Sequence, residues 1–293
     1  MAEPRIGSVL TAALVTVAVD PARAPVLVAL DFDGTLAPLQ DDPQASRILP
    51  EGVAVLQRLA DTGVHLAMVS GRGLTTLAQL AEVPLGTFLV GSHGGELAQV
   101  HPTGLARLDN HATLTDAQAA MLAAAGEQLS LVARGRPGVW VEAKPAAVVM
   151  HARVADDEVA EQALTQARTV GARLGTHVLE GKDVVELAVL DVDKGTAVAA
   201  LRAQLGAATV VYAGDDRTDE NALARLAPDD LGIKVGPGET LARHRVSDPQ
   251  AMVAALEVLA DAFAARRGAG GAGPTTNAGA DPVTGPVAGK AVG

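Results

Sequence analysis

The feature that most constrains the fold is a run of five apolar residues that ends directly in two carboxylates. Residues 26–30 read Val-Leu-Val-Ala-Leu, and Asp31-Phe32-Asp33-Gly34-Thr35 follows them. A short, wholly apolar run is typical of a strand that is buried on both faces, as in a parallel sheet covered by helices. Ligands of such sheets bind at the carboxyl ends of the strands. The sequence therefore predicts a parallel sheet with a carboxylate-rich site at the end of its first strand.

Strand and helix patterns alternate on both sides of a differently patterned middle. We expect core strands at 26–30, 65–70, 88–90, 209–213 and 231–235, and core helices at 51–62, 74–81, 218–226 and 248–265. In the middle we expect helices at 115–131 and 156–174, and strands at 139–143, 147–153, 176–180 and 184–188. Alternation of this kind predicts an α/β core with helices on both faces of the sheet. The core would comprise residues 25–106 and 190–267, interrupted by an α+β cap at 107–189.

The two ends of the chain differ in composition. Residues 6–19 are apolar, with Ile6, Val9, Leu10, Ala13, Leu14 and Val17 at helical spacing. Ala22-Arg23-Ala24 resembles a signal-peptidase site, but Glu3 weakens the charged leader and cleavage would leave Pro25 first. The run is shorter than the about 20 residues of a membrane span, so we expect residues 1–24 to form a helix packed on the core of a cytoplasmic protein. Residues 268–293 are mostly Gly, Ala, Pro and Thr, which predicts a disordered tail.

Charge and cysteine content exclude several functions. The chain has 34 acidic and 23 basic residues, a net charge of −11. This balance argues against a nucleic-acid partner and against binding to an anionic membrane, although an anionic small substrate could bind a locally positive site. The absence of cysteine excludes disulfides, thiol catalysis and Cys-ligated metals. Only five of the basic residues are lysines, and the planar guanidinium of arginine cannot replace their compact charge at a tight site.

The carboxylate pair after the first strand indicates a metal site. Asp31 and Asp33 are two residues apart, so they share a face of the strand end. Two carboxylates so close cannot both stay ionised without a cation or a shared proton. Mg²⁺ is the usual hard divalent cation for such oxygen ligands, and Gly34 permits a tight turn. The alternative is an ordinary turn with two solvated aspartates.

Four segments, in order, resemble the motifs of the haloacid dehalogenase superfamily. Asp31 to Thr35 resembles motif one, and the run His65 to Ser70 with Gly71-Arg72 resembles motif two. Lys194-Gly195-Thr196 resembles motif three, and Gly214-Asp215-Asp216-Arg217-Thr218-Asp219 resembles motif four. The resemblance covers roughly residues 25–265. It implies a Rossmann-like parallel-sheet core with an inserted α+β cap of the larger, C2 type.

The resemblance also implies roles. Asp31 would attack phosphorus and form an aspartyl-phosphate, and Asp33 would act as general acid and base. Ser70 and Lys194 would hold the phosphoryl group, although Ser70 could also cap a helix. Mg²⁺ would be bound by Asp31, the Asp33 carbonyl and Asp215. Asp216 and Asp219 would either support these ligands or begin the next helix. Further substrate contacts are expected from Gly34, Thr35, Gly71, Arg72 and His93.

Shorter signals in the insertion resemble the trehalose-6-phosphate phosphatase family. They are Glu142-Ala143-Lys144, His151-Ala152-Arg153 and Gly181-Lys182 followed by Glu186. The resemblance implies hydrolysis of a sugar phosphate, with Glu142, Arg153, Lys182 and Glu186 bonded to the sugar hydroxyls. Lys182 and Glu186 could instead pair with each other. Ser92 and Ala152 depart from the family, which often has Asn and an aromatic residue at these positions.

One aromatic residue stands out in the insertion. The chain has one Trp, one Tyr and three Phe, so stacking on a sugar must be sparse. Trp140, close to Glu142, is the candidate platform, but we assign it to the opposite strand face and favour a core position for it.

Four alternatives to a trehalose-6-phosphate phosphatase remain. They are a phosphatase for sucrose phosphate or for mannosylglycerate phosphate, a phosphomutase, and a non-catalytic sensor of sugar phosphates. A sensor would be expected to lose Asp31, Asp33 or Lys194, and all three are present.

Overall fold

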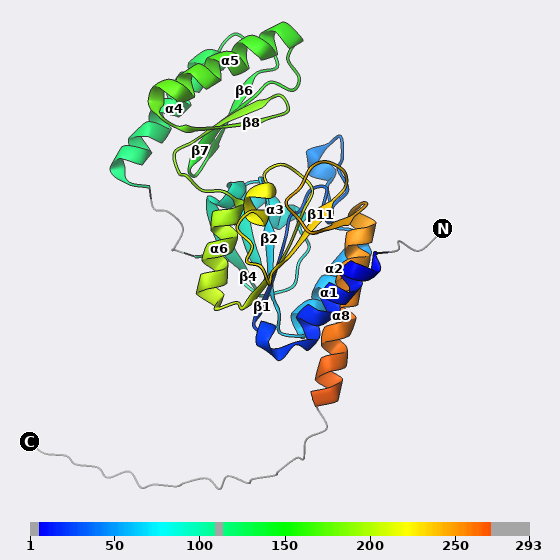
Figure 1. Cartoon of the computed structure of the whole chain (residues 1–293). Coiled ribbons are helices and arrows are strands. Elements are labelled where there is room, and N and C mark those ends of the chain that lie inside the picture. Colours follow the sequence, from blue (N-terminus) through cyan, green and yellow to red (C-terminus); the bar gives the residue numbers. More distant parts are fainter. Residues whose placement is uncertain (1–5, 109–113, 271–293) are drawn as a thin grey trace, which may run out of the picture.

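The computed structural model describes residues 6–108 and 114–270, and it contains two sheets (Figure 1). The larger sheet has eight strands in the order β12-β11-β10-β1-β2-β3-β4-β5. Its strands are β1 (Val26–Leu30), β2 (His65–Val69), β3 (Phe88–Gly91), β4 (Glu96–His101), β5 (Gly104–Arg107), β10 (Thr209–Gly214), β11 (Leu231–Val235) and β12 (His244–Val246). Strands β12 to β3 are parallel and the β4–β5 edge is antiparallel. The predicted α/β class with a parallel core is confirmed.

Helices cover both faces of this sheet because its central strands are apolar on both. On β1, Val28 and Leu30 belong to one buried cluster, and Leu27 and Ala29 belong to the other. The first face is covered by α1 (Ser8–Val19), α2 (Pro50–Asp61), α3 (Leu74–Leu80) and α8 (Pro249–Gly270). The second is covered by α6 (Lys194–Leu205) and α7 (Glu220–Leu223). Short 3₁₀ turns lie at Pro21–Arg23, Pro43–Ala45 and Ser92–Gly94.

The N-terminal helix packs on the core alongside α8 (Figure 1). Its buried residues are Leu10, Leu14, Val17 and Ala18. Val9, which we placed on the apolar stripe, is 72% exposed. The buried residues are separated by four, three and one positions, so they lie along one face of the helix. Val9 lies outside this face.

The smaller sheet belongs to the inserted segment and stands apart from the core sheet (Figure 1). It is antiparallel, in the order β6-β7-β9-β8. Its elements are β6 (Trp140–Lys144), β7 (Ala147–His151), β8 (His177–Gly181), β9 (Val184–Ala188), α4 (Asp116–Ala133) and α5 (Asp157–Leu174). Val148, Met150, Val185 and Leu187 pack against the two helices in a separate buried cluster. The opposite face of the sheet is turned toward the core domain. We call this inserted module the cap.

The structure differs from the sequence-based expectation at the edges of the sheet and in two helices. Strands β4, β5 and β12 were not predicted, because short edge strands of mixed polarity lack a clear alternation. Strand β5 carries the core sheet to Arg107, one residue past the predicted boundary, and α8 continues to Gly270, five residues past the predicted helix end at Ala265. Helix α7 has four residues, fewer than predicted. The disordered tail was predicted over residues 268–293: its first three residues belong to α8, and residues 271–293 lie outside the described residues. No helix in the described ranges is long and apolar enough to cross a membrane.

Candidate active site

A cavity of about 720 Å³ lies between the carboxyl ends of the core strands and the cap sheet. The core contributes Asp31 and Asp33 after β1, Ser70 and Arg72 after β2, and Lys194 at the start of α6. The remaining lining residues are Asp41, Asp42, Pro43, Gln44, Gly71, Gly73, Thr76, His93 and Asp216 from the core and Trp140, Glu142, Lys144, His151, Arg153 and Val184 from the cap. Motifs that are 163 residues apart along the chain thus meet at one edge of the sheet, as predicted for parallel strands.

The centre of the site is a buried lysine between two carboxylates. Lys194 Nζ lies 2.7 Å from Asp31 Oδ1 and 2.8 Å from Asp219 Oδ1. Burial lowers the pKa of Lys194, but Asp31 and Asp219 raise it well above its usual range, so the ammonium stays charged. Burial raises the pKa of Asp31 well above its ordinary value, opposed by Lys194. Thr35 donates a hydrogen bond of 3.1 Å to Asp31 Oδ2, which fixes the other oxygen.

Asp219 is fully hydrogen-bonded. Its Oδ1 accepts from Lys194 and, at 2.5 Å, from the hydroxyl of Tyr212. Its Oδ2 accepts from the backbone N–H groups of Asp215 and Asp216, at 3.1 Å each. These four bonds use the lone pairs of the carboxylate. Asp219 therefore holds Lys194 and the turn after β10 in place, and it has little capacity left for a ligand.

The same turn brings a second carboxylate to Asp31. One oxygen of each of Asp31, Asp215 and Asp219 lies within 4.8 Å of the others. Burial raises the pKa of Asp215 to about 6, with added repulsion from Asp216 and Asp219. The backbone of Gly34 lies against this carboxylate: its φ is 76°, and a Cβ there would be 2.0 Å from Asp215 Oδ2. Gly34 is thus needed for a close approach of two chain segments.

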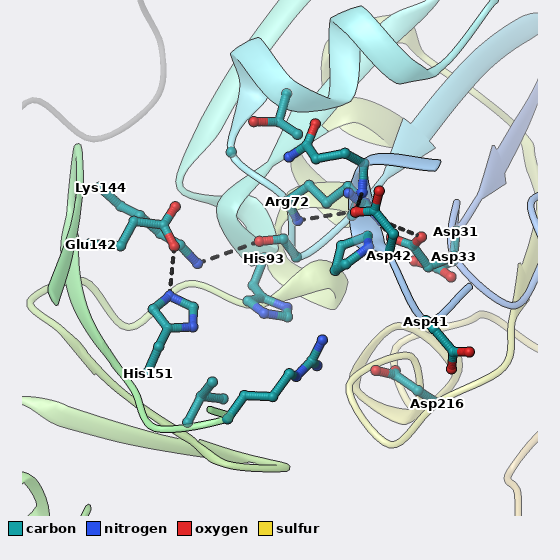
Figure 2. Close-up of a pocket in the computed structure, with 18 of the residues that line it drawn as sticks. Asp31, Asp33, Asp41, Asp42, Arg72, His93, Glu142, Lys144, His151 and Asp216 are labelled. Atoms are coloured by element: carbon teal, nitrogen blue, oxygen red, sulfur yellow. Dashed lines mark hydrogen bonds and ion pairs between the residues drawn. The ribbon is translucent and has the colours of Figure 1, made fainter. Parts of the chain in front are cut away.

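Asp33 and Arg72 form a bidentate ion pair (Figure 2). Arg72 Nε donates to Asp33 Oδ2 at 2.5 Å and Nη2 donates to Oδ1 at 2.7 Å. The guanidinium also donates to Ser46 Oγ at 2.9 Å and lies over the ring of Phe32. Arg72, which we predicted to contact the substrate, is therefore held by Asp33 through its Nε and Nη2.

The loops after β2 and β3 interlock. Ser70 is buried, and its Oγ accepts from the N–H of Arg72 at 3.2 Å, so it does not cap α3, whose N-cap is Gly73. Gly71 packs against His93, because a Cβ on Gly71 would lie 2.5 Å from the imidazole. His93 has a left-handed backbone, with φ of 56°, and burial lowers its pKa to about 4. The imidazole is therefore neutral at physiological pH.

The cap side of the cavity carries two polar pairs. Glu142 Oε2 lies 2.8 Å from His151 Nε2 (Figure 2). Lys144 Nζ lies 2.7 Å from Glu186 Oε2, and both side chains are about nine-tenths buried. Lys144 also reaches the Gly71 carbonyl of the core at 3.4 Å. Glu186 is thus paired with Lys144 and not with Lys182.

The predicted sugar-binding residues occupy different positions. Glu142 and Arg153 line the cavity. Glu186 lies behind it, next to the smaller space that adjoins Ser92 and Ala146. Lys182 is exposed on the turn between β8 and β9 and is not part of the cavity lining. A role of Lys182 in sugar binding remains a prediction.

The core position that we favoured for Trp140 is wrong. Trp140 is 44% exposed and lines the cavity. Residues two apart on a strand share a face, so Trp140 and Glu142 point to the same side, whereas Val141 packs toward the cap helices. Ala152, where the family often has an aromatic residue, is buried in the cap core.

Sequence reasoning missed several residues that support the site. Lys144 bridges the cap and the core, and buried Lys234 donates to the backbone carbonyl of Asp215. The scarcity of lysine was a signal for both, because three of the four described lysines are buried or nearly so and face this region. Glu96 is also buried and accepts from the N–H of Leu74 and the hydroxyl of Ser92, at 2.9 and 2.8 Å. Glu96 closes the segment Gly91–Glu96 that follows the third predicted strand, but no role was assigned to it from the sequence.

Comparison with known proteins identifies the family. The model of the trehalose-phosphatase family matches residues 29–251. A trehalose-phosphate phosphatase of Mycobacterium avium is 40% identical over 204 residues, which are 67% of this chain and 50% of that protein. A bifunctional trehalose-6-phosphate synthase/phosphatase of Thermoproteus tenax is 35% identical over 243 residues, 80% of this chain and 32% of that protein. The chain therefore spans about half or less of the length of these relatives.

Solved structures show the same fold. The structure of a trehalose-6-phosphate phosphatase related protein aligns with a TM-score of 0.65 and 24% identity, over 82% of this chain and 99% of that chain. The C-terminal domain of a trehalose-6-phosphate phosphatase of C. albicans aligns with a TM-score of 0.65 and 20% identity, over 89% of this chain and 99% of that chain. A haloacid dehalogenase-like hydrolase of Bacteroides thetaiotaomicron aligns with a TM-score of 0.57. Together with the family match, the motif order and the strand-end site, these alignments show that the chain belongs to the trehalose-phosphatase family, on a haloacid dehalogenase-like fold.

Proposed function

We propose that this protein hydrolyses trehalose 6-phosphate to trehalose and phosphate through an aspartyl-phosphate, as a step of trehalose formation. The observation that carries the proposal is the buried Asp31–Lys194–Asp219 group at the end of β1, in a chain that belongs to this family. Asp31, Lys194, Glu142 and Arg153 all line the cavity between core and cap, so the phosphate would bind at Asp31 and Lys194 and the sugar at Glu142 and Arg153.

Asp31 is the proposed nucleophile. Its Oδ1 is bonded to Lys194 and its Oδ2 to Thr35, so the orientation of the carboxylate is set before the substrate arrives. Attack of a carboxylate oxygen on phosphorus forms the acyl phosphate as the bond to the sugar oxygen breaks. Lys194 supports this step because its fixed positive charge offsets the charge on the nucleophile and on the transferring phosphoryl group. Ser70, which lines the cavity, would donate to a phosphate oxygen.

Asp33 is the proposed general acid and base. It would give a proton to the leaving sugar oxygen and take one from the water that hydrolyses the acyl phosphate. In the structure its carboxylate is bound by Arg72. We infer that the phosphate of the substrate competes with Asp33 for Arg72, which would free the carboxyl group as the substrate binds. The neutral imidazole of His93 would border the phosphate and the first sugar ring.

The carboxylate cluster fits a hard divalent cation, and we propose Mg²⁺. The donors are oxygens, and burial, with added repulsion from neighbouring carboxylates, raises the pKa of both Asp31 and Asp215, a cost that a bound cation would offset. Asp31, Asp215 and the Asp33 carbonyl would hold the ion, while Asp219 remains bonded to Lys194. When bound, the ion would neutralise the charge between the nucleophile and the phosphate. Lys234 holds the Asp215 carbonyl and so keeps this turn in position.

A phosphate-release screen of the purified protein tests the proposal. Trehalose 6-phosphate, sucrose 6-phosphate, mannosylglycerate phosphate and glucose 6-phosphate should be compared with and without Mg²⁺. We expect trehalose 6-phosphate to have the highest kcat/KM, and a chelator to abolish release. A higher kcat/KM for another sugar phosphate would refute the substrate, and no release from any of the four would refute the enzyme activity.

A further inference from the structure

Trp140 is an aromatic side chain that the proposed mechanism does not use. It begins β6, on the face that also carries Glu142 and Lys144. That face is turned to the cavity, whereas Val148, Met150 and Val185 on the other face of the sheet pack on the cap helices. Of the cavity residues that the structure describes, Trp140 is the only Phe, Tyr or Trp. A large indole left 44% exposed in a polar cavity is a typical position for ligand contact.

The orientation of the indole ring is fixed by His151 on the neighbouring strand β7. Trp140 and His151 face each other in the β6–β7 register. Their rings are stacked, with centroids 4.8 Å apart and planes 6° apart. His151 is itself fixed, because its Nε2 lies 2.8 Å from Glu142 Oε2. Trp140 therefore presents a pre-oriented apolar surface with little side-chain entropy left to lose on binding.

The position of Trp140 along β6 decides which part of a ligand it can reach. Lys144, at the other end of the strand, lies 3.4 Å from the Gly71 carbonyl of the core, next to Ser70. Trp140 is four residues away from Lys144, roughly 13 Å at the rise of a strand. A monosaccharide phosphate anchored by its phosphate at Asp31 and Lys194 would occupy the Lys144 end. A second sugar ring would extend toward the indole.

We propose that Trp140, backed by His151, is the stacking platform for the unphosphorylated ring of a disaccharide phosphate, and that it favours disaccharide over monosaccharide phosphates. This inference rests on the proposed function and names the residue that sets its substrate class. The C–H face of a pyranose is apolar and packs on an aromatic ring, while hydroxyls at its edge bond to Glu142 and Arg153 nearby. Contact of this kind contributes about tenfold in affinity.

Kinetics of a Trp140→Ala variant test the platform. We expect kcat/KM for trehalose 6-phosphate to fall about tenfold, mainly through KM, and kcat/KM for glucose 6-phosphate to change less than about twofold. Trp140→Phe, which keeps a flat ring, should recover most of the loss. Leu131→Ala is the matched control, because Leu131 is an exposed apolar residue of the cap outside this cavity. Unchanged kinetics for trehalose 6-phosphate, or equal losses on both substrates, would overturn the proposal.

Fluorescence gives a second readout that does not depend on turnover. Trp140 is the only tryptophan of the chain, so its emission reports on this position alone. In Asp31→Asn protein with Mg²⁺, trehalose 6-phosphate should change the emission in a saturable way, and glucose 6-phosphate should change it much less. If calorimetry shows that trehalose 6-phosphate binds but the emission does not change, the proposal that Trp140 stacks on the sugar is wrong, whereas the proposed substrate is retained. If the substrate neither binds nor is hydrolysed by the unaltered protein, both proposals fail.

Discussion

Replacement of Lys194 by methionine tests the electrostatic account of the site. Lys194 Nζ is within 2.8 Å of two carboxylates, and the side chains of Lys194, Asp31 and Asp219 are at most 5% exposed. Removing the ammonium leaves two buried carboxylates without their common cation. Breaking a buried ion pair in this way costs about 3–5 kcal/mol. Thr35 and Tyr212 still donate hydrogen bonds to the two carboxylates. We therefore expect the free energy of unfolding to fall by about 4 kcal/mol at pH 7.5, the cost of one broken buried ion pair and not of two.

The loss of stability in this variant should depend on pH. Lys194 lowers the pKa values of Asp31 and Asp219, so its removal raises both folded-state values further above the unfolded value of about 4. A carboxyl group with a raised folded-state pKa loses stability as the pH rises through that pKa. The difference between the variant and the native protein should therefore be smaller at pH 5 than at pH 7.5.

Urea unfolding with a chelator, at pH 5 and pH 7.5, measures this effect. In a thermal melt, the expected loss in the free energy of unfolding corresponds to a decrease in Tm of about 10 °C at pH 7.5. Lys182→Met is the matched control, because Lys182 is exposed and outside the cavity, and it should change the free energy of unfolding at neither pH. A loss below about 1 kcal/mol in Lys194→Met, or the same loss at both pH values, would refute the reasoning.

Four further variants test the site, and two of them follow from the same geometry. Asp31→Asn should abolish phosphate release because the amide is a poor nucleophile, and substantial residual release by the folded variant would remove Asp31 from that role. Gly34→Ala should lower the free energy of unfolding by more than about 1 kcal/mol and reduce turnover, because φ is 76° and a Cβ would meet Asp215; an unchanged melting curve would contradict this. From the family resemblance, and not from the cavity lining, Lys182→Ala and Glu186→Ala should lower kcat/KM for trehalose 6-phosphate roughly ten- to hundredfold but spare a small aryl phosphate, and equal losses on both substrates would exclude sugar selection.

The proposed catalytic residues at the carboxyl ends of the core strands could be predicted from the sequence, because their positions depend on local sequence patterns. Apolar runs that end in polar residues mark buried strands and their carboxyl ends, and parallel strands bring those ends to one edge. Asp31, Ser70, Lys194 and the turn at Asp215 were placed together on this basis, and the structure brings them together. Strand parity is equally local, and its correct application would have put Trp140 on the cavity face.

The tertiary structure decided the partners of the charged side chains. The sequence offered Lys182 as the partner of Glu186, four residues away, but Lys144 from another strand takes that place. Arg72 is bound to Asp33, and Glu96 organises the loops after β2 and β3. These contacts join residues from different elements, and long charged side chains can reach many neighbours. Burial selects among these partners, because a charge removed from water must be paired, and burial is known only once the chain has folded.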